Sequence, residues 1–257
     1  AGGDNASADE LREKILFSSQ TESKTKVTML QQAIKESEQN GGDSVTVLNL
    51  FDRTMKASPK DADISNMKAM YMKLKGMPDD SVNAAFEHTL SIEPDNNMAR
   101  VKLIQDKWDK KKWDEVISLS TAGTQYNPDD MVFYYFLGLG YFQKDDDDRA
   151  LDALKRGVGE INDRTDPDIA SDFYGSMGDI LFKKKRQEEA FEAYDNSLKW
   201  KEDNIVVLNN YAYYLSELRR DLKRAEQMSF KTVQAEPTNS TYLDTYAWIL
   251  FLQKRYD

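Results

Sequence analysis

Large apolar residues recur along the chain in short helical patterns separated by polar turns. A large apolar residue is followed directly by a smaller or more compact one five times, as Leu103-Ile104, Leu137-Gly138, Met177-Gly178, Tyr211-Ala212 and Tyr246-Ala247. The second residues of these pairs are 34, 40, 34 and 35 positions apart. Because a self-similar period of this length is typical of stacked repeats, the pattern predicts an array of helical hairpins.

A second column of residues keeps the same phase. Its members are Tyr134, Tyr174, Leu208 and Leu243, which are 40, 34 and 35 positions apart. Two independent columns therefore share the one longer step, which unrelated helices would not do. The extra residues fall in 159–168, where Gly, Asn, Asp and Pro predict a lengthened turn. This turn is the best candidate for a domain boundary, although a repeat array is expected to have none.

The most complete unit lies at 131–157. Its first helix carries Tyr134, Leu137, Gly138 and Tyr141 on one face, and its second carries Ala150, Leu154 and Gly157. Small side chains let two antiparallel helices approach closely, and large neighbours fill the space beside them. The unit resembles the tetratricopeptide repeat, a helix–turn–helix module. The resemblance implies an all-α fold, a right-handed α–α superhelix or solenoid of such repeats.

The expected organisation is a single repeat array over 1–257. It consists of a disordered lead at 1–8, divergent N-terminal helices at 9–59, repeats at 60–94, 95–128, 129–160, 169–204 and 205–239, and the first helix of a truncated repeat at 240–257. Within the divergent part we predict helices near Asp9–Phe17, Thr25–Gln39 and Ser44–Ala57. We expect the chain to be a fragment of a longer array, with a possible end-to-end homodimer through the uncapped C-terminal helix.

Charge excludes one class of partner. The net charge is −10, with 35 basic and 45 acidic residues, whereas nucleic-acid binding requires clustered Lys and Arg. The basic runs Lys107–Lys112 and Lys183–Arg186 fall at turns between helices, where we interpret them as solvated helix ends. The acidic run Asp145–Asp148 is placed to cap the following helix. It lacks the ligand spacing of a calcium loop, so no metal site is predicted.

No enzyme motif is present. The chain has no Cys and one His, His88, and it contains no phosphate-binding G-x-x-x-x-G-K-[ST] loop, G-x-S-x-G elbow or H-E-x-x-H sequence. We therefore expect neither catalysis nor a cofactor. The longest apolar run, Met131 to Phe142, is too short to span a bilayer.

The resemblance implies that the first helix of each unit lines a concave face. The lining positions are Val101, Gln105, Trp108, Val132, Tyr135, Leu139, Phe142, Asp172, Asp179, Phe182, Val206, Asn209, Tyr213, Asp244, Trp248 and Phe251. Nine of them are the predicted partner-binding residues: Trp108, Tyr135, Leu139, Phe142, Phe182, Asn209, Tyr213, Trp248 and Phe251. Each large member has an alternative role as packing between adjacent units. Capture of a C-terminal carboxylate is disfavoured, because Asn209 lacks the Lys pair that family members use for this.

Aromatic lining favours a non-enzymatic scaffold that binds a peptide or helix of another protein in its groove. The alternative is a carbohydrate or small-ligand module in which Tyr135, Phe142, Tyr213 and Trp248 stack on sugar rings. The absence of Cys, the polar start without Met and the similarity to acidic bacterial arrays indicate a bacterial, extracytoplasmic protein. It would be periplasmic or membrane-anchored by a removed N-terminal segment, with the cytoplasm as the alternative location.

Overall fold

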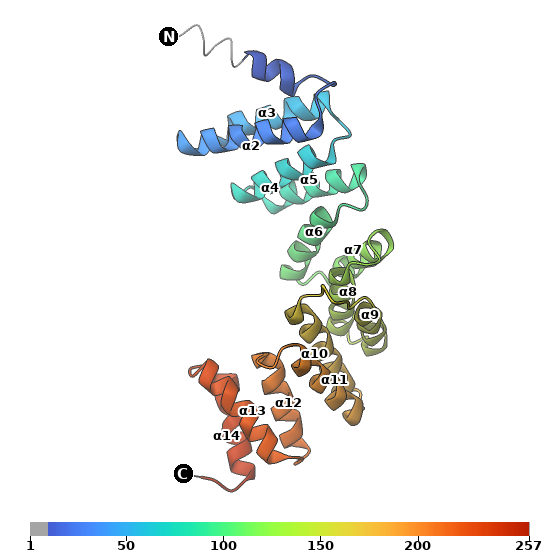
Figure 1. Cartoon of the computed structure of the whole chain (residues 1–257), viewed down its shortest axis with the longest axis vertical. Helices are drawn as coiled ribbons and strands as arrows, with labels where there is room; N and C mark the ends of the chain where they lie inside the picture. The colour runs from blue at the N-terminus through green and yellow to red at the C-terminus, as the bar shows by residue number, and fades with distance from the viewer. Residues whose placement is uncertain (1–9, 257) are drawn as a thin grey trace. The chain divides into compact units, whose positions relative to one another are not determined.

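The computed structural model describes residues 10–256, and the predicted lead at 1–8 lies outside them. Within this part the chain forms helices and no strand, which confirms the all-α fold class (Figure 1). A short helix at 10–16 precedes the others. These are α2 (Ser23–Gln39), α3 (Ser44–Ala57), α4 (Ala62–Leu74), α5 (Asp79–Ile92), α6 (Asn97–Asp109), α7 (Trp113–Tyr126), α8 (Met131–Gln143), α9 (Asp147–Gly159), α10 (Pro167–Lys183), α11 (Gln187–Trp200), α12 (Ile205–Glu217), α13 (Leu222–Ala235) and α14 (Ser240–Leu252).

The chain divides into two compact units. The first comprises Ala1–Lys112 with Gln125–Asn127, and the second comprises Trp113–Thr124 with Pro128–Asp257. The division falls at the turn between α6 and α7, and the long turn before α10 lies inside the second unit.

Glycines allow the helix pairs of the second unit to pack closely. A Cβ atom on Gly138 would lie 2.6 Å from Cγ of Leu154, and one on Gly178 would lie 2.5 Å from Cε1 of Tyr194. Both distances are shorter than van der Waals contact. The small-residue column of the sequence is therefore the line along which α8 contacts α9 and α10 contacts α11.

Aromatic rings form the core between successive hairpins of the second unit. Tyr194 is fully buried and stacks on Tyr211 of the next hairpin, with ring centroids 5.1 Å apart. Phe191 stacks on the same Tyr211 ring at 5.3 Å. Each hairpin thus buries its apolar face against its neighbour, as expected for a repeat array.

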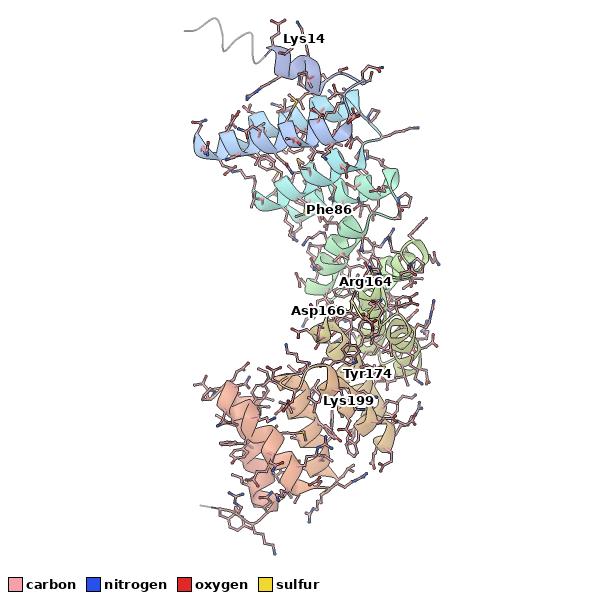
Figure 2. All side chains as sticks on the ribbon, viewed as in Figure 1. Lys14, Phe86, Arg164, Asp166, Tyr174 and Lys199 are labelled. Carbon is pink, nitrogen blue, oxygen red and sulfur yellow. The ribbon has the colours of Figure 1, made fainter. Side chains whose placement is uncertain are left out.

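The first unit buries its own core around α2, α3 and α4. Leu16 from the short helix at 10–16 is 3% exposed and packs with Leu30, Phe51 and Ile64. The helix predicted near Asp9–Phe17 therefore covers the α2–α3 hairpin (Figure 1). Phe86 on α5 is likewise buried (Figure 2).

Asp and Asn residues begin most of these helices. Asp146 accepts a hydrogen bond from the backbone N–H of Arg149, which is the capping role expected for the acidic run. Helix α10, which follows the long turn, begins in the same way. Asp166 accepts a hydrogen bond from the backbone N–H of Asp168, and Pro167 occupies the first helical turn. Figure 2 shows Arg164 and Asp166 in this turn.

The basic residues at the helix ends form ion pairs with the preceding hairpin. In the first unit Lys75 pairs with Glu38 and Lys110 with Asp79. The ion pairs in the second unit are Lys144–Asp114, Lys183–Asp145, Lys184–Asp148, Arg220–Glu188 and Arg255–Glu226. Basic residues of one turn thus form ion pairs with acidic residues of the preceding hairpin. The interpretation of the basic runs as solvated helix ends did not predict these pairs.

Candidate binding face

The predicted lining residues lie on the first helices of the hairpins. Trp108 is half-buried on α6 in the first unit. The other predicted partner-binding residues belong to α8, α10, α12 and α14 of the second unit. We call the predicted lining positions of these four helices the first-helix face.

Part of this face is occupied by packing between hairpins. The Tyr135 ring lies 5.2 Å from the ring of Phe173 on α10, and burial raises the pKa of Tyr135. Phe182 stacks on Tyr214 of α12 with ring centroids 3.9 Å apart and an interplanar angle of 22°. Tyr135 and Phe182 therefore hold successive hairpins together, as the alternative interpretation of the sequence allowed.

Phe142 and Leu139 are also half-buried. The ammonium group of Lys183 lies 5.0 Å from the centroid of the Phe142 ring. This ammonium also pairs with Asp145 and Asp147, and these pairs hold it over the ring.

The aromatic residues of α12 and α14 are more open. Tyr213 is 40% exposed, Trp248 is 38% exposed and Phe251 is 54% exposed. The Trp248 and Phe251 rings stack with centroids 5.6 Å apart and an interplanar angle of 16°. Because Tyr213 and Trp248 occupy equivalent positions of consecutive repeats, the second unit presents an exposed aromatic strip from α12 to α14, and α12 contacts α14.

Asp179 is a half-buried carboxylate on this face. The Tyr194 hydroxyl donates a 2.5 Å hydrogen bond to Oδ1, and Nδ2 of Asn210 lies 3.2 Å from both carboxylate oxygens. Burial raises the pKa of Asp179, while these two hydrogen bonds oppose the shift. The sequence predicted that Asp179 lies on this face but did not predict its two hydrogen-bond partners. One of them, Asn210, lies on the first helix of the next hairpin.

Comparison with known proteins identifies the fold. No family model matches the sequence, and no curated protein matches it. Among solved structures, Pseudomonas aeruginosa PilF is 16% identical with a TM-score of 0.63, over 86% of this chain and 96% of that one. YrrB, described as a TPR protein with an unusual peptide-binding site, is 14% identical with a TM-score of 0.59, over 77% and 97%. The chain has the tetratricopeptide-repeat fold.

Two further structures agree with this fold. A thermophilic tetratricopeptide-repeat protein of Thermus thermophilus, TTC0263, is 16% identical with a TM-score of 0.54, over 74% of this chain and 99% of that one. A chain of the anaphase-promoting-complex hetero-tetramer Cut9–Hcn1 is 12% identical with a TM-score of 0.62. The match covers 80% of this chain and 39% of that one. At these identities the likeness establishes the repeat fold and does not identify a ligand.

The predicted binding residue Asn209 is buried. It is 6% exposed, and its Oδ1 has no hydrogen-bond partner. Its Nδ2 lies 3.4 Å from Oδ1 of Asn210, which is a long contact. Asn209 thus lies beneath the exposed strip rather than on it.

The lining positions of the first-helix face carry charge of one sign, although the Lys183 ammonium approaches Phe142. The lining positions of α8, α10, α12 and α14 include Asp172, Asp179 and Asp244 and no Lys or Arg. Asp172 and Asp244 are exposed. A ligand of this face therefore meets aromatic rings and carboxylates together.

The outer side of α14 carries a second exposed apolar surface. Leu243 is 42% exposed and Ala247 is exposed, whereas the equivalent Leu208 and Ala212 of the preceding repeat are 3% and 0% exposed. Helix α12 packs against α13, and α14 also packs against α13. On the side of α14 opposite Leu243 and Ala247, Ile249 is fully buried.

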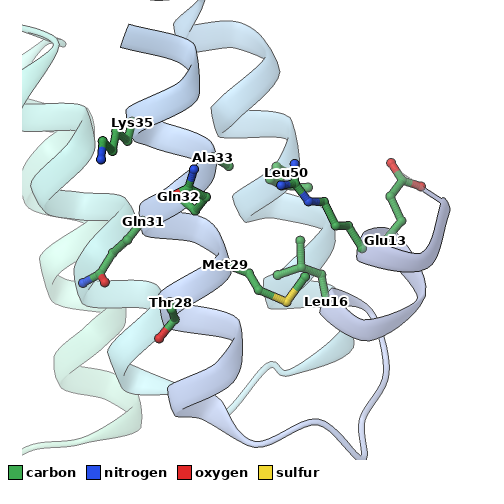
Figure 3. Close-up of a pocket in the computed structure, with 10 residues that line it drawn as sticks. Glu13, Leu16, Thr28, Met29, Gln31, Gln32, Ala33, Lys35 and Leu50 are labelled. Atoms are coloured by element: carbon green, nitrogen blue, oxygen red, sulfur yellow. The ribbon is translucent and has the colours of Figure 1, made fainter. Parts of the chain in front are cut away.

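The first unit contains a separate hollow between the helix at 10–16, α2 and α3 (Figure 3). Its volume is about 700 Å³, and Leu16, Met29 and Leu50 contribute apolar walls. Two charged residues at the hollow, Arg12 and Glu13, pair with other side chains. None of the predicted binding residues lines it.

Two further properties concern residues 10–256. None of the helices in this range combines the length and the apolar character needed to cross a bilayer. Over the same residues, no three His, Asp or Glu side chains are grouped in a way that would hold a metal ion.

Proposed function

We propose that this chain is a non-enzymatic scaffold whose second unit binds an extended peptide or a helix of another protein. The observation that carries the proposal is the exposure of Tyr213, Trp248 and Phe251, while Tyr135 and Phe182 of the same face are packed. Exposed aromatic side chains supply a large contact area at a small cost in side-chain entropy. They lie on two helices that contact each other, α12 and α14, so that a single ligand could reach all three.

Selection from a random peptide library on the immobilised chain tests the proposal. The comparison is with a variant carrying Tyr213→Ala, Trp248→Ala and Phe251→Ala together. We expect peptides to be enriched on the wild-type chain and lost on this variant. Enrichment of the same peptides on both proteins would show that the strip is not the binding site.

One observation favours carbohydrate binding as a second candidate. The exposed Trp248 ring is flat, is backed by Phe251, and has the carboxylate of Asp244 one helical turn away. Sugar rings stack on such surfaces and form hydrogen bonds with polar groups at the edge. Binding to a glycan array that Trp248→Ala abolishes, without enrichment of any peptide, would favour this candidate over the scaffold.

We also propose that two copies pair through the outer side of α14. Leu243 and Ala247 are the exposed equivalents of residues that are buried in α12. A helix from a second copy would remove this apolar surface from water. Sedimentation velocity over a range of concentrations tests the pairing, with Leu243→Glu expected to yield the monomer. A wild-type chain that is monomeric at the highest concentration would contradict it.

A further inference from the structure

Arginine side chains are held in a recurring arrangement in both units. In the first unit, Glu13 and Phe17 are one helical turn apart, and Arg53 of α3 binds them together. The Arg53 guanidinium lies 4.1 Å from the Phe17 ring centroid and donates two 2.7 Å hydrogen bonds to the Glu13 carboxylate. We call a carboxylate followed one turn later by an aromatic ring an arginine clamp.

The second unit repeats this arrangement on α11. Glu188 and Phe191 are one turn apart, and Arg220 from the turn between α12 and α13 binds to both. The Arg220 guanidinium lies 5.1 Å from the Phe191 centroid and donates a 2.5 Å hydrogen bond to Glu188. The planar guanidinium suits both contacts, because it stacks on a ring while its N–H groups point to a carboxylate.

A third clamp lies on α14 and holds no arginine of this chain. Asp244 and Trp248 are one turn apart on the exposed side of the helix, and Trp248 is stacked on Phe251. Among residues 10–256, no Lys or Arg pairs with Asp244, and none lies over the Trp248 ring. Indole is the aromatic ring that attracts cations most strongly.

We propose that Asp244 and Trp248 bind the side chain of an arginine in a partner peptide. The inference rests on the proposed function and states the chemistry of the ligand. The guanidinium stacks on the exposed face of Trp248 and donates hydrogen bonds to the Asp244 carboxylate, as Arg53 and Arg220 do within the chain. The first-helix face of the second unit favours such a ligand, since its lining positions include three Asp and no basic residue.

Two pools of short fluorescent peptides test the clamp. Both have random flanks, and the central residue is fixed as arginine in one pool and as citrulline, its uncharged isostere, in the other. Binding is measured by anisotropy for the wild-type chain and for Asp244→Asn and Trp248→Ala. Asp203→Asn is the matched control, because it removes the same charge from an exposed position in the turn before α12.

We expect the arginine pool to bind about tenfold more tightly than the citrulline pool, as for a hydrogen bond between charged groups. Asp244→Asn and Trp248→Ala should remove this preference, and Asp203→Asn should retain it. Equal binding of both pools, unaffected by Asp244→Asn, would overturn the clamp and leave peptide binding intact. Binding of neither pool would contradict both the clamp and the proposed function. A dimer that Asp244→Asn dissociates would assign the clamp to an arginine of a second copy instead.

Discussion

The hydroxyl of Tyr194 donates a 2.5 Å hydrogen bond to Oδ1 of Asp179, and these two residues link the two helices of one hairpin. Asn210 on α12 approaches the same carboxylate, so the network also joins this hairpin to the next. A buried carboxyl group is costly to ionise, and burial raises the pKa of Asp179 from the ordinary value of 3.8.

Replacing this carboxyl group should change how stability depends on pH. The pKa of Asp179 is raised in the folded state, so its protonated form contributes favourably to the free energy of unfolding. This contribution is fully present below the unfolded pKa of 3.8 and is lost as the pH rises through the folded pKa. Asp179→Asn has no titrating carboxyl group at this position and therefore does not lose stability in this way. We expect the variant to gain free energy of unfolding relative to the wild type as the pH is raised from about 4, near the unfolded value, to neutrality.

Urea denaturation of both proteins across this pH range measures the effect. Asp172→Asn serves as a control, because Asp172 is exposed on the same helix. Parallel pH profiles for Asp179→Asn and the wild type would mean that Asp179 titrates as it does in the unfolded chain.

Close helix contact predicts the effect of enlarging Gly178. A Cβ atom there would lie 2.5 to 2.7 Å from ring carbons of the buried Tyr194. Gly178→Ala should therefore lower the free energy of unfolding by about 1–3 kcal/mol, although alanine is the better helix former. Gly159→Ala is the matched control, since nothing lies within 4 Å of its Cβ position. It should be neutral or slightly stabilising in thermal or urea denaturation, and equal losses for both variants would refute the packing argument.

Packed and exposed aromatic residues of the first-helix face should respond differently to truncation. Phe182→Ala removes a ring that stacks on Tyr214 at 3.9 Å, and we expect a loss of about 2 kcal/mol, less than for a fully buried Phe. Tyr213→Ala removes a side chain that is 40% exposed, and its loss should be below about 1 kcal/mol. Chemical denaturation compares the two, and a larger loss for Tyr213→Ala would place that ring in the core.

The ion pairs between successive turns should contribute little to the free energy of unfolding, and this contribution should decrease with added salt. Lys183 contacts Asp145 and Asp147, and the Lys183 and Asp145 side chains remain open to solvent while Asp147 is 18% exposed. Lys183→Gln should therefore destabilise the chain less than Gly178→Ala. The difference from the wild type should shrink at roughly 1 M NaCl, where screening extends over about 3 Å. Urea denaturation at two salt concentrations measures it, and a salt-independent loss would indicate a packing role for the lysine stem.

Local signals predicted the helices of the divergent N-terminal part well. The prediction of Ser44–Ala57 matches α3, and Thr25–Gln39 lies within α2, which begins at Ser23. Asp and Asn caps and the break at 40–42 delimit these helices. The small-residue column also predicted which side of each first helix meets the second, since close approach leaves few alternatives to Gly and Ala.

The division of the first-helix face into packed and exposed parts was not predictable from one sequence. The spacing placed Phe182 and Tyr213 on the same side of their helices, but what covers each ring depends on the helix that follows. Tyr214 stacks on Phe182, whereas it meets the Tyr213 ring edge-on and leaves that side chain 40% exposed. The Asp179–Asn210 contact was detectable in principle, because it joins the first helices of consecutive hairpins.

We infer that the aromatic strip of α12 and α14 binds a protein segment. The most direct test is titration calorimetry of a library-selected peptide against Trp248→Ala and Trp200→Ala. The two tryptophans are 38% and 37% exposed, but Trp200 ends a second helix away from the strip. We expect Trp248→Ala to raise the Kd by about tenfold or more and Trp200→Ala to leave it unchanged. Equal Kd values for both variants and the wild type would contradict this inference.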